Sequence, residues 1–244
     1  MSNICAAVHA VFQRRQDLDE REKQNFTYAH NDTSVPERIS RTANVNVADF
    51  PDVVRDMRLD AFGRNIPVSS DETLAFLRIC VAMAKPRKIL EIGTAVGVSG
   101  ICMLKICPSA ELTTIEKNAE FASEARRNFE KAGLSDRVTL LEGDAADKLV
   151  GLCGQFDFIF LDGPKVQYVK YLPELKRLLA SGGVIFADDV LLYGWVNGEN
   201  PVPPKRRMLV EHIREYLAAV QNEKSLTTTI VDVGDGVALS VKCK

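Results

Sequence analysis

Three carboxylates stand at the ends of two apolar segments that the sequence predicts to be strands. Asp162 ends the segment 156–162, and Asp188 and Asp189 end the segment 183–188. Close carboxylates repel one another, so such a cluster usually needs a cation. Oxygen ligands suit Mg²⁺, Mn²⁺ or Ca²⁺. We therefore expect a divalent metal, Mg²⁺ first, on these three residues; the alternative is that Asp188 or Asp189 only caps the segment that follows.

A lysine lies close to the first of these acids in the sequence. Lys165 comes three residues after Asp162, at the predicted start of a helix. A hydroxyl on a metal loses its proton more readily, and a nearby amine can accept that proton. Asp162 and Lys165 are therefore the expected catalytic residues, although Lys165 could equally be a solvated surface lysine.

A glycine-containing turn follows the first predicted strand, 88–92. It reads Glu91, one apolar residue, then Gly93 and, four positions later, Gly97. The glycines let the chain turn tightly and let a ligand approach the backbone. Ala95 occupies the place of the middle glycine in the dinucleotide fingerprint G-x-G-x-x-G, which argues against an NAD dehydrogenase.

Acids also follow the second and third predicted strands. Glu116 ends the segment 111–116, and Asp144 follows the segment 137–142. At these places Glu116 can accept hydrogen bonds from ribose hydroxyls, and Asp144 from an adenine amino group. The alternatives are a solvated carboxylate for Glu116 and a helix N-cap for Asp144. Together the acids favour a nucleoside cofactor that carries positive charge, which points to S-adenosylmethionine.

Strands and helices must alternate to place these strand ends together. Helices are predicted at 71–84, 97–106, 118–132, 166–180 and 204–221, the first of them capped by Ser70 or Ser69. The closing strands at 226–232 and 236–242 are joined by a short turn. Such alternation predicts an α/β fold with a Rossmann-like, mostly parallel sheet and an antiparallel closing strand. We expect a helical extension over residues 1–65 and the main domain over 66–244.

Bulk composition excludes several protein classes. The 244 residues carry 31 Lys and Arg against 33 Asp and Glu, so the chain is no polycation. Six cysteines form no C-x-x-C pair, which indicates reduced thiols. No signal peptide is evident, and no apolar run reaches the ~20 residues of a membrane span. We expect a cytoplasmic protein without a membrane partner.

Several segments carry a resemblance to a known family: ILEIGTAVGVSG, LTTIEKN, LLEGDA, FIFLDGPKVQY, VIFADDV and VGDGVAL. With them, residues 66–244 resemble the metal-dependent class I O-methyltransferases that include the catechol and caffeoyl-CoA enzymes. The resemblance implies a cofactor site of Val68, Glu91, Gly93, Ser99, Glu116, Asp144, Ala145 and Asp162. It also implies the metal ligands and the base named above, an acceptor pocket near Tyr168 and Trp195, and a homodimer.

Two positions depart from the pattern of this family. Asp189 stands where the family usually has Asn, which adds a negative charge that would tighten cation binding but blunt the cation's acidifying effect. Ala238 stands where animal catechol enzymes have a Glu that grips the catechol. The segments IPVSSDETLAFL and DGPKVQY look closest to the bacterial branch that includes tRNA 5-hydroxyuridine methyltransferases.

The resemblance leaves two classes of acceptor, and we expect 5-hydroxyuridine of tRNA ahead of a small phenol or catechol. For tRNA, Lys205, Arg206 and Arg207 and arginines near the N-terminus would meet phosphate, while Tyr193 and Trp195 would stack on a base. The alternatives are a small catechol, a phenol or a caffeoyl-CoA-like acceptor. In that case Lys205, Arg206 and Arg207 are only the solvated face of a helix, and Trp195 only packs under a lid. A protein that binds S-adenosylmethionine without turnover is a further alternative, against which the acids and Lys165 argue.

Overall fold

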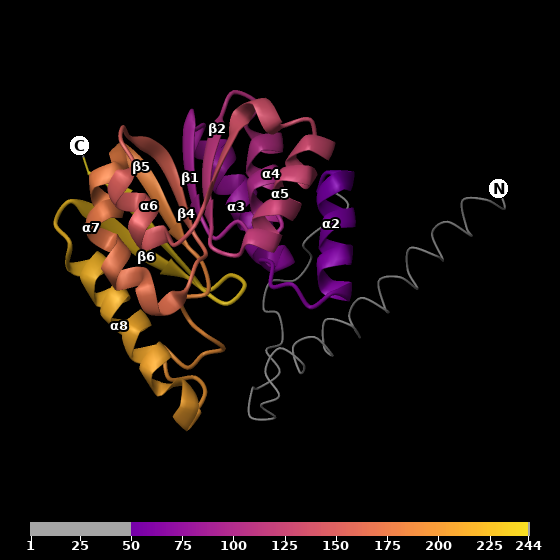
Figure 1. The fold of residues 1–244 in the computed structure, drawn as a ribbon. Helices are drawn as coiled ribbons and strands as arrows, with labels where there is room; N and C mark the ends of the chain where they lie inside the picture. The colour runs from indigo at the N-terminus through magenta and orange to yellow at the C-terminus, as the bar shows by residue number, and fades with distance from the viewer. Residues whose placement is uncertain (1–49, 244) are drawn as a thin grey trace, which may run out of the picture.

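The computed structural model describes residues 50–243 and contains one mixed sheet of seven strands in the order β3-β2-β1-β4-β5-β7-β6 (Figure 1). Neighbouring strands among the first five are parallel, and β7 runs antiparallel to both β5 and β6. The strands are β1 (Lys88–Ile92), β2 (Glu111–Glu116), β3 (Val138–Glu142), β4 (Phe156–Leu161), β5 (Leu179–Ala187), β6 (Leu226–Val231) and β7 (Val237–Lys242). The predicted mostly parallel sheet with an antiparallel closing strand is confirmed.

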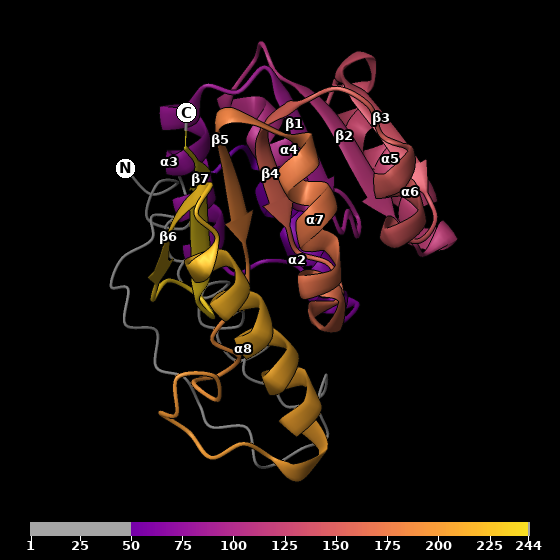
Figure 2. The same cartoon turned by 90° about the vertical axis from the view of Figure 1, so that its left-hand side faces the viewer.

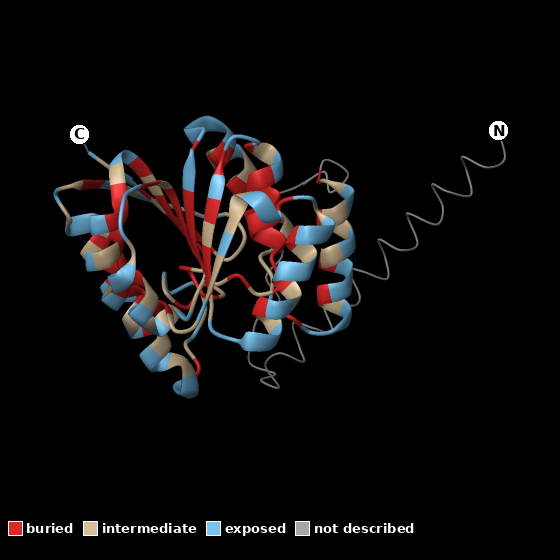
Figure 3. Ribbon diagram, turned by 45° about the horizontal axis from the view of Figure 1, so that its top comes forward, coloured by how far each residue is buried: buried red, intermediate tan, exposed pale blue. Residues whose placement is uncertain are grey.

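Helices cover both faces of the sheet, and each face has its own apolar core. One core includes residues of α6, α7 and α8, and the other includes residues of α2, α3, α4 and α5. The bounds are α2 (Asp52–Gly63), α3 (Asp71–Ala84), α4 (Val98–Ile106), α5 (Ala119–Lys131), α6 (Ala145–Gly151), α7 (Tyr168–Leu178) and α8 (Arg207–Asn222). Figure 3 shows the buried strands between helices whose outer faces are exposed. Burial on both faces explains why every residue of β4 except Asp157 is apolar.

Two predicted boundaries on the chain differ from the structure. The helix predicted over 166–180 ends at Leu178, because Leu179 already pairs with Phe156 as the first residue of β5. That strand therefore begins four residues before the predicted position 183, and its pairing with β4 shifts register between Phe156 and Phe158. Pairing with a neighbouring strand cannot be read from local sequence, so the prediction missed this part of β5.

The last two strands extend the sheet on one side (Figure 2). β7 inserts between β5 and β6, and Ala187 at the end of β5 pairs with Ala238. The turn between β6 and β7 therefore lies at the same edge as the carboxyl end of β5. This places the turn beside Asp188 and Asp189.

The first described residues belong to the packed body of the protein. Phe50, Val54 and Ala61 are buried in the same core as α3 and α4. The division of the chain at residue 65 stays a prediction, and residues 1–49 of the predicted extension lie outside the described residues. Among the described residues, no helix has the length and apolar character that a membrane span requires.

Candidate active site

The three predicted metal ligands lie together at the carboxyl ends of β4 and β5. These strands are parallel neighbours, and Leu161 pairs with Ala187, so the residues that follow them are adjacent. Single carboxylate oxygens of Asp162, Asp188 and Asp189 lie within 4.8 Å of one another. The sheet register alone thus produces the carboxylate cluster that the sequence predicts.

Lys165 lies inside this cluster. Its Nζ is 2.6 Å from Asp162 Oδ1 and 3.1 Å from Asp189 Oδ2, and it lies 5.4 Å from the centre of the Tyr168 ring. Burial lowers the pKa of Lys165, but the charges of Asp162 and Asp189 outweigh burial and raise this pKa well above its ordinary value. Beside the bare carboxylates Lys165 is therefore an ammonium that donates hydrogen bonds.

The charge of the cluster fits a divalent cation. Three carboxylates and one ammonium leave a formal charge of −2 when all are ionised. Burial, together with the charges of Asp189 and Asp162, raises the pKa of Asp188 well above its ordinary range. A cation would relieve this repulsion, and an all-oxygen donor set suits Mg²⁺, Mn²⁺ or Ca²⁺.

Hydroxyl groups from the start of α3 hold two of the acids. Ser69 Oγ donates to Asp162 Oδ2 over 3.3 Å, and Thr73 Oγ1 donates to Asp188 Oδ1 over 3.3 Å. Ser70 caps α3, as predicted, by accepting from the Thr73 amide. The cap fixes the first turn of α3 and with it the hydroxyl that reaches Asp188.

Glu91 is a fully buried carboxylate in the middle of the sheet. It accepts hydrogen bonds from Ser99 Oγ and Thr114 Oγ1, each over 2.6 Å. Burial raises the pKa of Glu91 to about 7 despite these two bonds. Its surroundings connect β1, β2 and the start of α4, which bound the predicted cofactor site.

The glycine turn after β1 brings its backbone close to Asp162 of the carboxylate cluster. Gly93 has φ of +98°, and a Cβ there would lie 2.4 Å from the carbonyl oxygen of Asp162. Glu116 holds the far side of the turn by accepting from the Ala95 amide over 2.8 Å and from the Asn118 amide over 2.8 Å. Glu116 thus lies at the predicted strand end and joins two loops.

Asp144 caps the N-terminus of α6, which is the alternative that the sequence left open for it. Its Oδ1 accepts from the Ala146 amide over 3.0 Å at the start of α6, and its Oδ2 is 2.8 Å from Lys117 Nζ. Hydrogen bonds from Lys117 and from the Ala146 amide lower the pKa of Asp144. The cap does not exclude a contact with adenine, which stays a prediction for Asp144 and for the neighbouring Ala145.

A small cavity of about 20 Å³ brings several predicted cofactor residues together. Val68, Gly93, Ser99 and Asp162 all line it. Ser69 and Thr94 line the cavity too, although they were not among the predicted cofactor residues. Both are small polar residues directly beside predicted ones, which is the signal that could have found them.

The predicted aromatic residues of the acceptor pocket are buried. Tyr168 is 0% exposed, donates its hydroxyl to the carbonyl of Leu161 and packs edge-on against Tyr216. Trp195 is 1% exposed and lies 4.9 Å, ring centre to ring centre, from the half-buried Tyr193. The prediction that Trp195 stacks on a base is therefore not supported, because its ring is enclosed by the apolar core.

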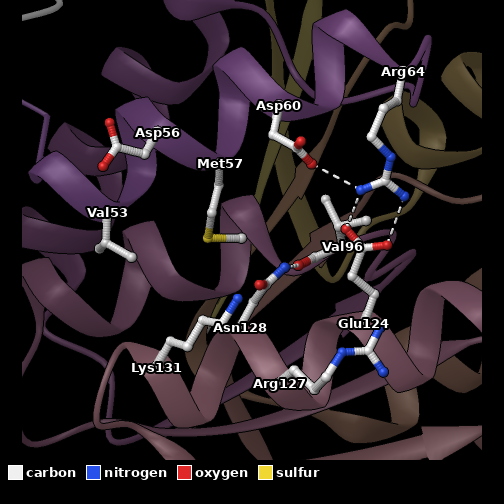
Figure 4. Close-up of a pocket in the computed structure, with 10 residues that line it drawn as sticks. All are labelled: Val53, Asp56, Met57, Asp60, Arg64, Val96, Glu124, Arg127, Asn128 and Lys131. Carbon is white, nitrogen blue, oxygen red and sulfur yellow. Dashed lines mark hydrogen bonds and ion pairs between the residues drawn. The ribbon is translucent and has the colours of Figure 1, made fainter.

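The described N-terminal arginines have partners within the chain. Arg55 pairs with Asp52, and Arg58 is 2.8 Å from Asp71. Arg64 contacts Asp60 over 2.8 Å and holds Glu124 through both guanidinium nitrogens, 2.6 and 2.7 Å away. A groove of about 750 Å³ lies between α2 and α5, and Figure 4 shows Arg64 among the residues that line it.

The other basic residues predicted to meet tRNA differ in exposure. Arg206 is half-buried and Arg207 is exposed, whereas Arg38 and Arg41 lie outside the described residues.

Comparisons with known proteins place this geometry among O-methyltransferases. A profile of the O-methyltransferase family matches residues 50–243. The chain is 34% identical over 176 residues to a protein of Niastella koreensis named catechol O-methyltransferase, an alignment covering 68% of this chain and 78% of that one. The O-methyltransferase of Bacillus cereus, solved with S-adenosylhomocysteine, is 27% identical with a TM-score of 0.70, over 81% and 93% of the two chains. TomG of Streptomyces achromogenes, an O-methyltransferase involved in tomaymycin synthesis and solved with S-adenosylmethionine, is 25% identical with a TM-score of 0.71, over 80% and 91%.

Proposed function

The chain belongs to the O-methyltransferase family, an S-adenosylmethionine-dependent enzyme class, and from that premise we propose that it methylates a hydroxyl of a small hydroxylated aromatic with the help of a divalent cation. The fold class and the enzyme class predicted from the sequence are thereby confirmed. The observation that carries the proposal is the carboxylate cluster of Asp162, Asp188 and Asp189 around Lys165. Asp162 also lines the small cavity between β1 and α3, so one residue borders both halves of the site.

The cofactor is proposed to lie along the carboxyl ends of β1, β2 and β3. S-adenosylmethionine, when bound, supplies the methyl group. Val68, Gly93 and Ser99 border the cavity where the methionine end would lie, with Glu91 buried behind Ser99. Glu116 at the end of β2 would accept from the ribose hydroxyls, and Asp144 with Ala145 would lie at the adenine. The two relatives solved with S-adenosylmethionine or S-adenosylhomocysteine support the identity of the cofactor.

The cation is proposed to be held by Asp162, Asp188 and Asp189, with Mg²⁺ the first choice. A divalent ion there would lower the pKa of a hydroxyl brought next to it. The hydroxyls of Ser69 and Thr73 hold Asp162 and Asp188 in place. The close approach of Gly93 to Asp162 keeps the cluster beside the cofactor cavity, and nearness of the two reactants supplies much of the acceleration in such transfers.

Lys165 is proposed to accept the proton of the acceptor hydroxyl at Nζ. The negative charges of Asp162 and Asp189 stabilise the ammonium form of Lys165. Lys165 can therefore act as a base only when another positive charge balances those of the two carboxylates. Its Nζ already lies within hydrogen-bond distance of Asp162, so no large movement is needed. The position of Lys165 is thus compatible with a base role.

The structure favours a small acceptor over tRNA. Arg55, Arg58 and Arg64 already pair with acids of the chain, which leaves less positive charge for phosphate. Trp195 is enclosed by the core, so a base would find less aromatic surface than predicted. A relative named catechol O-methyltransferase supports the same choice.

Transfer of a labelled methyl group to alternative acceptors tests the proposal. Purified enzyme with Mg²⁺ and labelled S-adenosylmethionine is offered a panel of catechols and phenols beside hydroxyuridine-containing tRNA. We expect label in a catechol and none in tRNA, with little dependence on salt, because small-ligand contacts are short-range.

The double charge reversal of Arg206 and Arg207 separates the two acceptor classes further. For a small acceptor it should leave catechol turnover within about twofold, since these residues lie at the start of α8. Label entering tRNA, with activity that falls steeply as salt rises and is lost in the reversal, would establish the tRNA branch instead. The homodimer and the cytoplasmic location stay predictions.

A further inference from the structure

The turn between β6 and β7 contacts the loop that follows β5. The amide of Val190 donates to the Gly236 carbonyl over 2.9 Å, and the amide of Leu191 donates to the Asp235 carbonyl over 2.9 Å. The carboxylate of Asp235 accepts from the amide of Tyr193, with Oδ1 at 2.6 Å. Three hydrogen bonds thus join this turn to the residues that follow Asp189.

The loop needs such support because its backbone is strained. Asp189, Leu192 and Tyr193 have φ of +54°, +46° and +58°, the left-handed region that side chains disfavour. Such backbone is energetically unfavourable for residues with a side chain, and it persists only where its surroundings hold it. The 234–236 turn provides hydrogen bonds on both sides of Leu192.

The same turn also packs against the support of Asp188. A Cβ on Gly234 would lie 2.2 Å from Thr73 Oγ1, the hydroxyl that donates to Asp188, and a Cβ on Gly236 would lie 2.3 Å from Leu191 Cγ. Only glycine fits at these two places. The turn therefore packs directly against Thr73, which holds Asp188, and against Leu191 in the loop that follows Asp189.

The side chain of Asp235 is not needed to close its own turn. The amide of Gly236 donates to the Val233 carbonyl over 2.9 Å, which closes the turn through the backbone. The carboxylate reaches across to Tyr193, 42 residues earlier in the sequence. This long-range contact distinguishes Asp235 from an ordinary turn aspartate.

We propose that Asp235 is a positioning residue, whose carboxylate holds the strained loop 189–193 and so fixes Asp189 for cation binding. The cation part rests on the proposed function, whereas the holding of the loop does not. Residues that orient metal ligands typically change metal affinity by about 10–100-fold when removed. We expect the same order of effect for Asp235.

The variants Asp235→Ala and Asp235→Asn test this, with Asp136→Ala, an exposed acid of the 3-10 turn Ser135–Arg137, as the control. Hydrogen exchange of the Tyr193 amide is followed by NMR, Mn²⁺ affinity by electron paramagnetic resonance, and S-adenosylhomocysteine affinity by calorimetry. Asp235→Ala should speed the exchange of the Tyr193 amide and weaken Mn²⁺ binding about 10–100-fold. Asp235→Asn keeps an acceptor oxygen and should retain most of both properties.

Unchanged affinity for S-adenosylhomocysteine is expected in all three variants, because the cofactor residues follow other strands, and it also reports that each variant is folded. An unchanged Tyr193 exchange rate in Asp235→Ala would overturn the holding of the loop. Faster exchange with wild-type Mn²⁺ affinity would overturn the link from the loop to Asp189. Absence of Mn²⁺ binding by the wild type would overturn the proposed cation site and that link together, while the Tyr193 exchange rate still decides whether Asp235 holds the loop.

Discussion

At the scale of single residues, the site holds three carboxylates and one lysine close together, so negative charge exceeds positive charge. Lys165 touches Asp162 and Asp189, while Asp188 is buried against both acids without a lysine of its own. The positions of these residues could be predicted because the carboxyl ends of parallel strands meet at one edge of the sheet. The protonation state of Lys165 could not, because it depends on distances that only the fold sets.

Replacing Asp189 by asparagine tests how much of this charge the site needs. The amide keeps one oxygen as a ligand and removes one negative charge, so Asp189→Asn should retain turnover. Its affinity for Mn²⁺ should fall, because the formal charge of the cluster drops from −2 to −1. Titration of Mn²⁺ into both proteins measures the change; an equal or tighter affinity in the variant would show that the charge of Asp189 does not strengthen cation binding.

Replacing Glu116 by alanine tests the cofactor site. The change removes charge-assisted hydrogen bonds to the proposed ribose, so affinity for S-adenosylhomocysteine should fall by on the order of 1–3 kcal/mol. Glu116 also accepts from the amides of Ala95 and Asn118, so Glu116→Gln, which keeps one acceptor oxygen, is the matched variant. Calorimetry that finds wild-type affinity in folded Glu116→Ala would remove this residue from the site.

Glu91 gives the protein a predictable dependence of stability on pH. Burial raises its pKa to about 7 in the fold, from 4.5 in the unfolded chain, so the folded state binds its proton more tightly. Raising the pH from about 5 to 8 should therefore lower the free energy of unfolding, by on the order of 2–3 kcal/mol from this group.

The variant Glu91→Gln lacks this titration and can still pair with the hydroxyls of Ser99 and Thr114. It should match the wild type near pH 5 and be more stable near pH 8, as measured by urea unfolding without cofactor. A difference between the two proteins that stays constant over this range would show that Glu91 is ionised throughout.

At the scale of elements, turns decide the site more than helices do. The sequence predicted the glycine turn after β1 from its residues, and the cap of α3 at Ser70 is confirmed. The sequence indicated α6 only indirectly, through Asp144 as a possible cap. It missed the first part of β5, because the pairing of that part with Phe156 is a tertiary contact. It left Trp195 open between stacking on a base and packing under a lid, because the packing of the loop after β5 leaves no local signal; the ring is buried.

Two glycines of one turn offer a matched pair of substitutions. Gly93 and Gly97 have nearly the same φ, +98° and +94°, so alanine costs similar backbone strain at both. A Cβ on Gly93 would lie 2.4 Å from the Asp162 carbonyl, whereas at Gly97 the nearest atom would be 3.4 Å away.

Gly93→Ala should therefore push the turn away from Asp162 and abolish measurable binding of S-adenosylhomocysteine, while Gly97→Ala should mainly lose about 1 kcal/mol of stability. Thermal unfolding with and without S-adenosylhomocysteine reports both effects. Equal ligand-induced stabilisation of the two variants would refute a role for the close approach of Gly93 to Asp162.

At the scale of the whole molecule, one mixed sheet places two reactants at one edge. In the order β3-β2-β1-β4-β5-β7-β6, β2 and β3, whose ends border the proposed cofactor site, lie on one side of β1. The strands that Asp162, Asp188 and Asp189 follow, β4 and β5, lie on the other side. This architecture followed from the alternation of strands and helices in the sequence. The acceptor did not, because it depends on side chains of loops and on residues 1–49, which lie outside the described part of the chain.

The central claim is that a divalent cation on the carboxylate cluster assists methyl transfer to a small hydroxylated aromatic. The most direct measurement is transfer of labelled methyl to a catechol by enzyme freed of metal with EDTA, before and after Mg²⁺ is restored, with S-adenosylhomocysteine affinity measured alongside. The account predicts that turnover is lost on chelation and returns with Mg²⁺, while binding of S-adenosylhomocysteine changes little, because its proposed site shares only Asp162 with the cation site. Full turnover of a catechol by the metal-free enzyme would contradict it.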